Sequence, residues 1–114
     1  MKNLQLARIL QEVADLLEIK GENPFKVRAY RRAAQNIELH PEDIERVARE
    51  GRLGEIEGVG EAIARKVEEW LATGQMEIHR QLREEFPAGV LEMMRVPGVG
   101  PKLAHALYRQ LGIA

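Results

Sequence analysis

The chain has 114 residues, of which 45% are hydrophobic and 31% charged, and its formal net charge is −1. This composition is typical of one globular domain or two small subdomains, and it excludes a disordered chain. No apolar run approaches the ~18 residues of a membrane-spanning helix, and the absence of cysteine excludes disulfides and thiolate metal sites. We therefore expect an intracellular protein that does not bind a membrane.

The first third of the chain predicts two helices, because apolar residues recur every three or four positions. The first helix is expected to begin with Asn3 as its N-cap, and its apolar stripe continues to Leu17. In the stretch GENP, Asn23 is expected to cap a second helix that has Pro24 at its first position and runs to about Ile37.

The rest of the chain also predicts helices and no strands. A third helix is expected to restart at Pro41 and to end at Gly51. Further helices are expected over residues 61–72, 76–85 and 101–110, and the turns LGEIEGVG and GVLEMMRVPGVG precede the first and the last of these. We therefore predict an all-α fold, a bundle of about seven short helices.

Charge is unevenly distributed along the chain. Residues 1–36 carry seven Lys or Arg against four Asp or Glu, whereas residues 37–57 carry three against seven. Four of the N-terminal cations are close together in KVRAYRR, namely Lys26, Arg28, Arg31 and Arg32. A local basic face on a nearly neutral chain predicts a small phosphate-binding surface.

The chain contains an internal repeat. IEGVGEAIARKVEEWLA at 56–72 aligns without gaps on VPGVGPKLAHALYRQLG at 96–112. Gly58 and Gly60 of the first copy pair with Gly98 and Gly100 of the second, forty residues later. A period of this length is typical of a repeated supersecondary unit, and two copies favour a pseudo-twofold pair over a solenoid.

Each Gly-Val-Gly lies in a tight turn just before a helix. Glycine permits positive φ and close approach of the backbone. The free N–H groups and the dipole of a helix N-terminus favour an anion. The turns therefore predict phosphate sites made by main-chain donors, which read no base sequence. A single turn of this kind is usually a simple helix connection, whereas two copies in register favour a binding function.

Both IEGVG and VPGVG match the h-x-G-h-G hairpin of helix-hairpin-helix motifs. Together with LLEIKGENPFKVRAYRRAA at 16–34 and LATG at 71–74, they resemble the N-terminal region of family X DNA polymerases of the bacterial type, with the layout of the lyase domain of DNA polymerase beta. The resemblance covers essentially the whole chain. It implies a lyase-type DNA-binding domain at residues 1–76 with the first hairpin, and the start of a thumb-like region at residues 77–114 with the second.

The resemblance implies a role in base excision DNA repair. The first hairpin would grip gapped or nicked DNA downstream of the gap, the second would grip the primer side, and a pocket would recognise the 5′-phosphate. The polymerase palm with its carboxylate triad is not in this chain, so we expect the N-terminal piece, natural or engineered, of a longer polymerase. That piece alone does not polymerise, and Mg²⁺ belongs only to the absent polymerase domain. We expect a bacterial cytoplasmic protein associated with the nucleoid.

The family motifs imply a set of site residues. The residues expected to bind DNA phosphates are Gly58, Gly60 and Ala62 at the first hairpin, Gly98, Gly100, Lys102 and Leu103 at the second, and Lys26, Tyr30 and Arg31 in the 5′-phosphate pocket. The backbone carbonyls expected to hold a sodium or potassium ion are those of Gly54, Ile56 and Val59, and of Met94, Val96 and Val99. No zinc is expected, because His40, His79 and His105 have no ligand spacing.

Lys66 falls on the position of the family lysine that forms a Schiff base with an abasic sugar phosphate before β-elimination. This chemistry needs a neutral amine, which burial or neighbouring cations such as Arg65 would favour. Two departures from the family leave lyase activity open, because Ala62 stands where a phosphate-binding lysine is common and Phe25 replaces a histidine. The alternative is that Lys66 is one solvated cation on an exposed helix face.

Three functions remain open from the sequence. The first is a gap-recognising module of a family X polymerase, with or without 5′-deoxyribose phosphate lyase activity. The second is a structural double hairpin that clamps duplex DNA without chemistry, and the third is a dimerisation module. Steep salt dependence of binding would favour the first two. A preference for a 5′-phosphate would favour the first.

Overall fold

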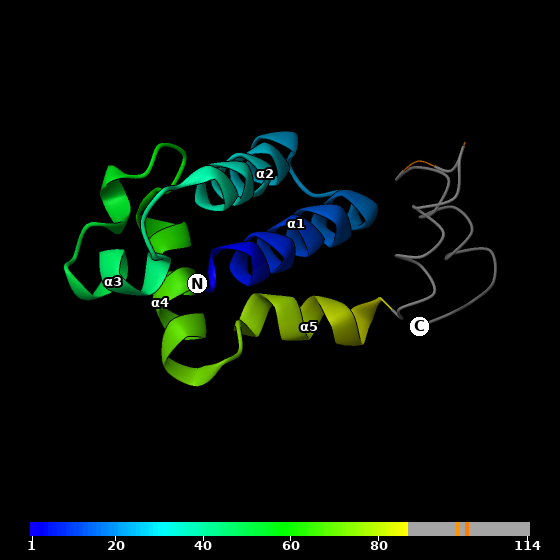
Figure 1. Cartoon of the computed structure of the whole chain (residues 1–114). Helices are drawn as coiled ribbons and strands as arrows, with labels where there is room; N and C mark the ends of the chain where they lie inside the picture. The colour runs from blue at the N-terminus through cyan, green and yellow to red at the C-terminus, as the bar shows by residue number, and fades with distance from the viewer. Residues whose placement is uncertain (87–97, 99, 101–114) are drawn as a thin grey trace.

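The computed structural model describes residues 1–86, 98 and 100. Over these residues the chain is helical and has no strand (Figure 1), which confirms the all-α fold class. The elements in order are α1 (Asn3–Lys20), α2 (Pro24–Leu39), α3 (Ile44–Arg49), the short 3-10 helix η1 (Leu53–Glu55), α4 (Glu61–Thr73) and α5 (Glu77–Glu85). The helix predicted over residues 101–110 lies outside the described part of the chain.

The long helix α1 lies at the centre of the described residues. It packs against α2 and α5, which lie on opposite sides of it, while α3 and α4 gather at the end near the N-terminus (Figure 1). The apolar stripe of α1 is buried where these helices meet, and each such side chain contributes about 1.5–3 kcal/mol. The stripe forms one core with apolar residues of α2, α3, α4 and α5. This core includes Leu6, Leu10, Val13, Val27, Ile37, Val47, Val67, Trp70 and Leu82.

The second helix begins as the sequence predicts. The Asn23 side chain accepts a hydrogen bond from the Phe25 amide at 2.8 Å, and Pro24 occupies the first helical position. The helix continues to Leu39, two residues beyond the predicted end. The cap at Asn23 is thereby confirmed.

The prediction that Asn3 caps α1 is wrong. Lys2 is the cap residue, and Asn3 lies inside the helix with only 3% of its surface exposed. Its side-chain Nδ2 donates to the Glu42 carbonyl at 2.8 Å, and its Oδ1 accepts from the Ile44 backbone amide at 2.9 Å. Asn3 therefore ties the start of α1 to the connection between α2 and α3.

The predicted start of the third helix is also wrong. The helix begins at Ile44 rather than at Pro41, because the Asp43 carboxylate caps it by accepting from the Glu45 amide at 3.1 Å. This short helix buries Ile44 and Val47. It then leads through η1 to the first hairpin.

The fifth helix is held on α1 by polar contacts at its surface. Glu12 of α1 accepts hydrogen bonds from His79 Nε2 at 2.8 Å and from Arg83. Burial alone would raise the pKa of Glu12, but these bonds outweigh it and hold that pKa below its ordinary value.

None of the helices in the described segments is both long and apolar enough to cross a membrane.

Candidate nucleic-acid interface

The first hairpin leaves donors free at the start of α4. Gly58 has a φ of +87°, and the Val59 amide donates to the Ile56 carbonyl at 3.0 Å, which closes the turn. Gly60 is the cap residue of α4 and offers no side chain to its amides. The first intrahelical bond comes from Ala64 to the Gly60 carbonyl at 2.9 Å. The backbone N–H groups from Gly60 to Ile63, which precede Ala64, are therefore available to an anion.

Helix α2 approaches this hairpin very closely. A Cβ atom on Gly58 would lie 2.9 Å from Arg32 Cγ and 3.2 Å from Asn36 Nδ2. Asn36 donates to the Glu57 carbonyl at 2.5 Å, and Arg32 forms an ion pair with the Glu57 carboxylate. Glycine at position 58 is thus needed both for its backbone conformation and for the space that it leaves to α2. No sequence pattern indicated the roles of Arg32, Asn36 and Glu57.

A cavity of about 840 Å³ opens between α2, the hairpin and α4, a size usual for ligand sites. It brings together most of the residues predicted for the first phosphate site and for the nucleophile, among them Lys26, Tyr30, Gly58, Gly60, Ala62 and Lys66. Ile63 of α4 and Ile78 of α5 add apolar walls. These residues come from three separate stretches of the chain, residues 26–30, residues 54–66 and Ile78, so the tertiary fold assembles the site.

The charges in this cavity leave two lysines unpaired. Lys26 is exposed and Lys66 half-buried, and neither forms an ion pair with any residue that the structure describes. The two glutamates that line the cavity each have an arginine partner, Glu57 with Arg32 and Glu61 with Arg65. Since its carboxylates are neutralised, the cavity favours an anion. Arg65 is engaged by Glu61 at 2.6 Å, so Lys26 is the unpaired cation that shares the cavity with Lys66.

Tyr30 adds a hydroxyl to this cavity. The residue is only 3% exposed, and burial raises its pKa to about 12, so the hydroxyl stays protonated at neutral pH. The Tyr30 oxygen is not sealed from solvent, and within the described segments it makes no hydrogen bond. It is therefore a donor that a bound oxyanion can use.

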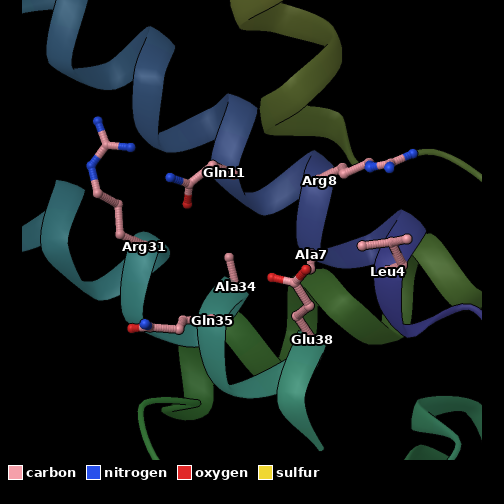
Figure 2. Close-up of a pocket in the computed structure, with 8 residues that line it drawn as sticks. All are labelled: Leu4, Ala7, Arg8, Gln11, Arg31, Ala34, Gln35 and Glu38. Carbon is pink, nitrogen blue, oxygen red and sulfur yellow. The ribbon is translucent and has the colours of Figure 1, made fainter.

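Arg31 lies away from Lys26 and Tyr30. Its guanidinium donates to Asp15 and Glu18 of α1, at 2.8 Å in each case. Figure 2 shows it at the edge of a different cavity, of about 520 Å³ between α1 and α2, whose other lining residues are Leu4, Ala7, Arg8, Gln11, Ala34, Gln35 and Glu38. The structure thus does not bring the three predicted residues of the 5′-phosphate pocket together.

The basic stretch KVRAYRR therefore does not form one face. Lys26 lines the cavity at the hairpin, Arg32 pairs with Glu57, and Arg31 faces α1. The Arg28 guanidinium lies 4.9 Å from the centre of the ring of Phe25, a residue that is 74% exposed. Because neighbouring residues of a helix point about 100° apart, cations close in sequence acquire different neighbours.

The carbonyls predicted to hold a monovalent ion differ in their availability. The Ile56 carbonyl already accepts from Val59, whereas those of Gly54 and Val59 accept no backbone hydrogen bond from the described residues. Nowhere in the described segments do three or more histidines or carboxylates group as metal ligands.

The second hairpin is described only at its glycines. Gly98 has a φ of +87°, the same value as Gly58. The other predicted residues of this hairpin lie outside the described part of the chain, namely Met94, Val96, Val99, Lys102 and Leu103.

Comparison with known proteins identifies the fold family. A family model described as a helix-hairpin-helix domain matches residues 1–76. The chain belongs to the helix-hairpin-helix domain family. A second family model, described as a SAM-like helix-hairpin-helix tandem, matches residues 90–114.

The chain is also similar to a curated polymerase. It is 30% identical over 113 residues to the DNA polymerase/3′-5′ exonuclease PolX of Bacillus subtilis (strain 168). The match covers 99% of this chain but only 19% of the relative, so this helix-hairpin-helix chain spans about a fifth of that protein's length. The similar part of the relative is its N-terminal region, which confirms the resemblance to family X polymerases.

Proposed function

We propose that this chain binds gapped or nicked DNA that carries a 5′-phosphate, without sequence specificity, as the N-terminal module of a family X DNA repair polymerase. One observation carries the proposal: a single cavity combines the unpaired amides at the start of α4 with Lys26, Lys66 and the Tyr30 hydroxyl. All four groups favour or donate to phosphate oxygens at neutral pH. The similarity to a protein named as a polymerase supports DNA as the partner.

Each group has a distinct part in this proposal. The amides from Gly60 to Ala62 hold a backbone phosphate of the strand. Lys26 and the protonated Tyr30 hydroxyl bind the terminal 5′-phosphate. Ala62 contributes only its main chain. Arg31 stays outside the pocket, because Asp15 and Glu18 hold it.

A monovalent cation completes the hairpin grip. The carbonyls of Gly54 and Val59, with that of Ile56, would hold Na⁺ or K⁺ between the turn and a phosphate oxygen. Met94, Val96 and Val99 would form the corresponding site of the second hairpin, whose glycines, with Lys102 and Leu103, would bind the primer-side backbone.

The 5′-phosphate pocket can be tested with two gapped DNA molecules that differ only in this phosphate. By fluorescence anisotropy the wild type should bind the phosphorylated DNA about tenfold more tightly, since charge-assisted hydrogen bonds each contribute about 1.5–3 kcal/mol. Lys26→Ala should lose most of this preference. Arg28→Ala is the matched control, because it removes a cation that lies outside the cavity. Equal affinity of the wild type for both DNA molecules would contradict the pocket.

Lys66 supports a second activity, 5′-deoxyribose phosphate lyase. Its half-buried amine lies in the same cavity among apolar residues and has no ion-pair partner in the described segments. In the proposed reaction the Lys66 amine attacks the sugar aldehyde, and water leaves as the imine forms. Loss of the C2′ proton to a base and cleavage of the C3′–O3′ bond then release the strand with its 5′-phosphate. Water hydrolyses the remaining imine, which frees Lys66 and the unsaturated sugar phosphate.

Borohydride trapping on a gapped DNA with a 5′ abasic sugar phosphate tests the nucleophile. Wild-type protein should form a covalent product, and Lys66→Arg should not, although it keeps the charge and should still bind the DNA. Equal trapping by both proteins would show that Lys66 is not the nucleophile and would leave the binding proposal intact.

A further inference from the structure

Arg32 and Glu57 form an ion pair beside the proposed phosphate site. We propose that Arg32 is not a phosphate ligand but the counter-ion of Glu57, and that it keeps this carboxylate from repelling the DNA backbone. The inference rests on the proposed function, since it concerns how the same hairpin admits a phosphate. Arg32 is in this sense a positioning residue.

Glu57 occupies an unfavourable place for a carboxylate in a phosphate site. It directly precedes Gly58, lines the cavity, and has 76% of its side chain exposed. A negative charge here lies next to the amides that are proposed to hold a phosphate. Repulsion between this carboxylate and a nearby phosphate lowers affinity and slows the approach of the DNA. The hairpin therefore needs something that neutralises Glu57.

Arg32 is placed to supply that charge. Its Nη2 atom contacts the Glu57 carboxylate, and its methylene groups lie over Gly58, where an added Cβ would be 2.9 Å from Arg32 Cγ. One turn later on α2, Asn36 donates to the Glu57 carbonyl at 2.5 Å. Helix α2 thus holds Glu57 by both its side chain and its main chain.

Folding stability does not account for this arrangement. Both side chains of the pair are mostly exposed, and exposed ion pairs contribute little to stability. Arg32 does not line the cavity, and the two lysines that do line it, Lys26 and Lys66, have no carboxylate partner among the described residues. The hairpin thus has two free lysines inside the cavity for the ligand and, beside the cavity, one arginine that is already engaged by Glu57.

A double-mutant cycle distinguishes a counter-ion from a phosphate ligand. Arg32→Gln, Glu57→Gln and the double variant remove the charges but keep the Cβ and Cγ methylene groups, and their affinity for the 5′-phosphorylated gapped DNA would be measured by fluorescence anisotropy. Arg32→Gln should weaken binding about tenfold and Glu57→Gln should strengthen it about threefold. The double variant should return to within about twofold of the wild type, since it removes both charges.

Two controls accompany the cycle. Arg32→Lys keeps the charge and should bind nearly as the wild type does. Arg80→Gln removes an arginine of α5 that is exposed and paired with Glu77 and Glu84, and it should change affinity less than about twofold. Thermal unfolding of every variant should stay close to that of the wild type, because the pair is exposed.

The possible outcomes separate the two proposals. If the wild type does not bind the DNA, the proposed function fails. If it binds and the double variant is as weak as Arg32→Gln, Arg32 is itself a phosphate ligand and the counter-ion inference is overturned. The inference is equally overturned if Arg32→Gln binds as tightly as the wild type.

Discussion

Lys26, Arg31 and Arg32 lie within seven residues of α2 and have three different neighbours. Lys26 faces the hairpin cavity, Arg31 is held by Asp15 and Glu18, and Arg32 by Glu57. A carboxylate partner largely decides what a cation can do, because it offsets the positive charge of an arginine and competes with a phosphate for its N–H donors. At this scale the unpaired lysines, rather than the number of cations, define the candidate site.

Tyr30 provides a pH-dependent prediction at the scale of one residue. Its pKa is about 12 in the folded chain against an ordinary value of 10.0, because burial disfavours the phenolate. Between these two values the unfolded state loses this proton while the folded state keeps it, so stability should fall as pH rises through that window. The loss from Tyr30 should be at most about 2 kcal/mol, since its hydroxyl opens to the cavity.

Urea unfolding of the wild type and of Tyr30→Phe measures this effect. Between pH about 9 and pH about 11.5, the free energy of unfolding of the wild type should fall relative to that of Tyr30→Phe. Tyr108 is present in both proteins and cancels in the comparison. A difference that stays constant over this range would show that Tyr30 titrates normally.

The hairpin and α2 form one structural unit at the scale of elements. The hairpin's position depends on the close approach of α2 to Gly58 and on the Asn36 bond to the Glu57 carbonyl. Since α2 also carries Lys26 and Tyr30, the same contact aligns the cavity with the amides of α4. A change at this contact should therefore affect both stability and binding.

Gly58→Ala tests that contact. The new methyl group would meet Arg32 at 2.9 Å, and alanine rarely adopts the φ of +87°, so we expect a destabilisation of about 1–3 kcal/mol. Gly54→Ala is the matched control, because that position has no heavy atom within 4 Å and no positive φ. Chemical denaturation should separate the two variants. Similar stability of both would mean that α2 does not constrain the hairpin.

Glu12 offers a second prediction at the scale of elements. Its pKa is lowered from an ordinary 4.5, because the hydrogen bonds to His79 and Arg83 outweigh burial. A carboxyl group with a lowered folded pKa stabilises the fold above its unfolded value and loses this effect as pH falls. The wild type should therefore be more stable than Glu12→Gln at pH about 7, and the difference should vanish towards pH about 3.

Circular dichroism during thermal unfolding at both pH values measures this difference. Glu22→Gln is the control, because Glu22 forms no ion pair with a described residue, and it should show no such pH dependence. If Glu12→Gln matches the wild type at neutral pH, the bonds of Glu12 to His79 and Arg83 contribute nothing to stability.

At the scale of the whole molecule the net charge is only −1, so attraction to DNA must come from local charge. The carboxylates of the cavity are neutralised by arginines, and that leaves Lys26 and Lys66 to dominate the field there. A nearly neutral chain whose described part presents two unpaired lysines in this cavity should contact few phosphates there.

Salt dependence measures the number of those contacts. We expect log K for gapped DNA to fall against log salt concentration with a slope of about −2 to −4, since each phosphate contributes about −0.9. Lys26→Ala should make this slope shallower by about one unit. A slope near zero would favour the alternative that the chain is a dimerisation module.

Particular residues show how much could be predicted from the sequence. The spacing of apolar residues and the cap at Asn23 predicted the helices well, because both depend on neighbours within one turn. The start of α3 was misplaced by three residues, since Asp43 could cap as well as any residue near Pro41. The local pattern predicts a cap at Asn3, but its actual partners, Glu42 and Ile44, are about forty residues away and leave no signal near Asn3 in the sequence.

The sequence by itself determined the all-α class and, through its repeat and motifs, the helix-hairpin-helix family, because periodicity and turn glycines are local properties of the chain. Only the tertiary structure decided which side chains share the cavity. It grouped Lys26, Tyr30 and Lys66 at the first hairpin, turned Arg31 towards α1, and placed Arg32 against Glu57. The physical reason is that the rotation of α2 against its neighbours is fixed by the packing of buried faces from distant segments, and that packing decides which way every exposed cation points.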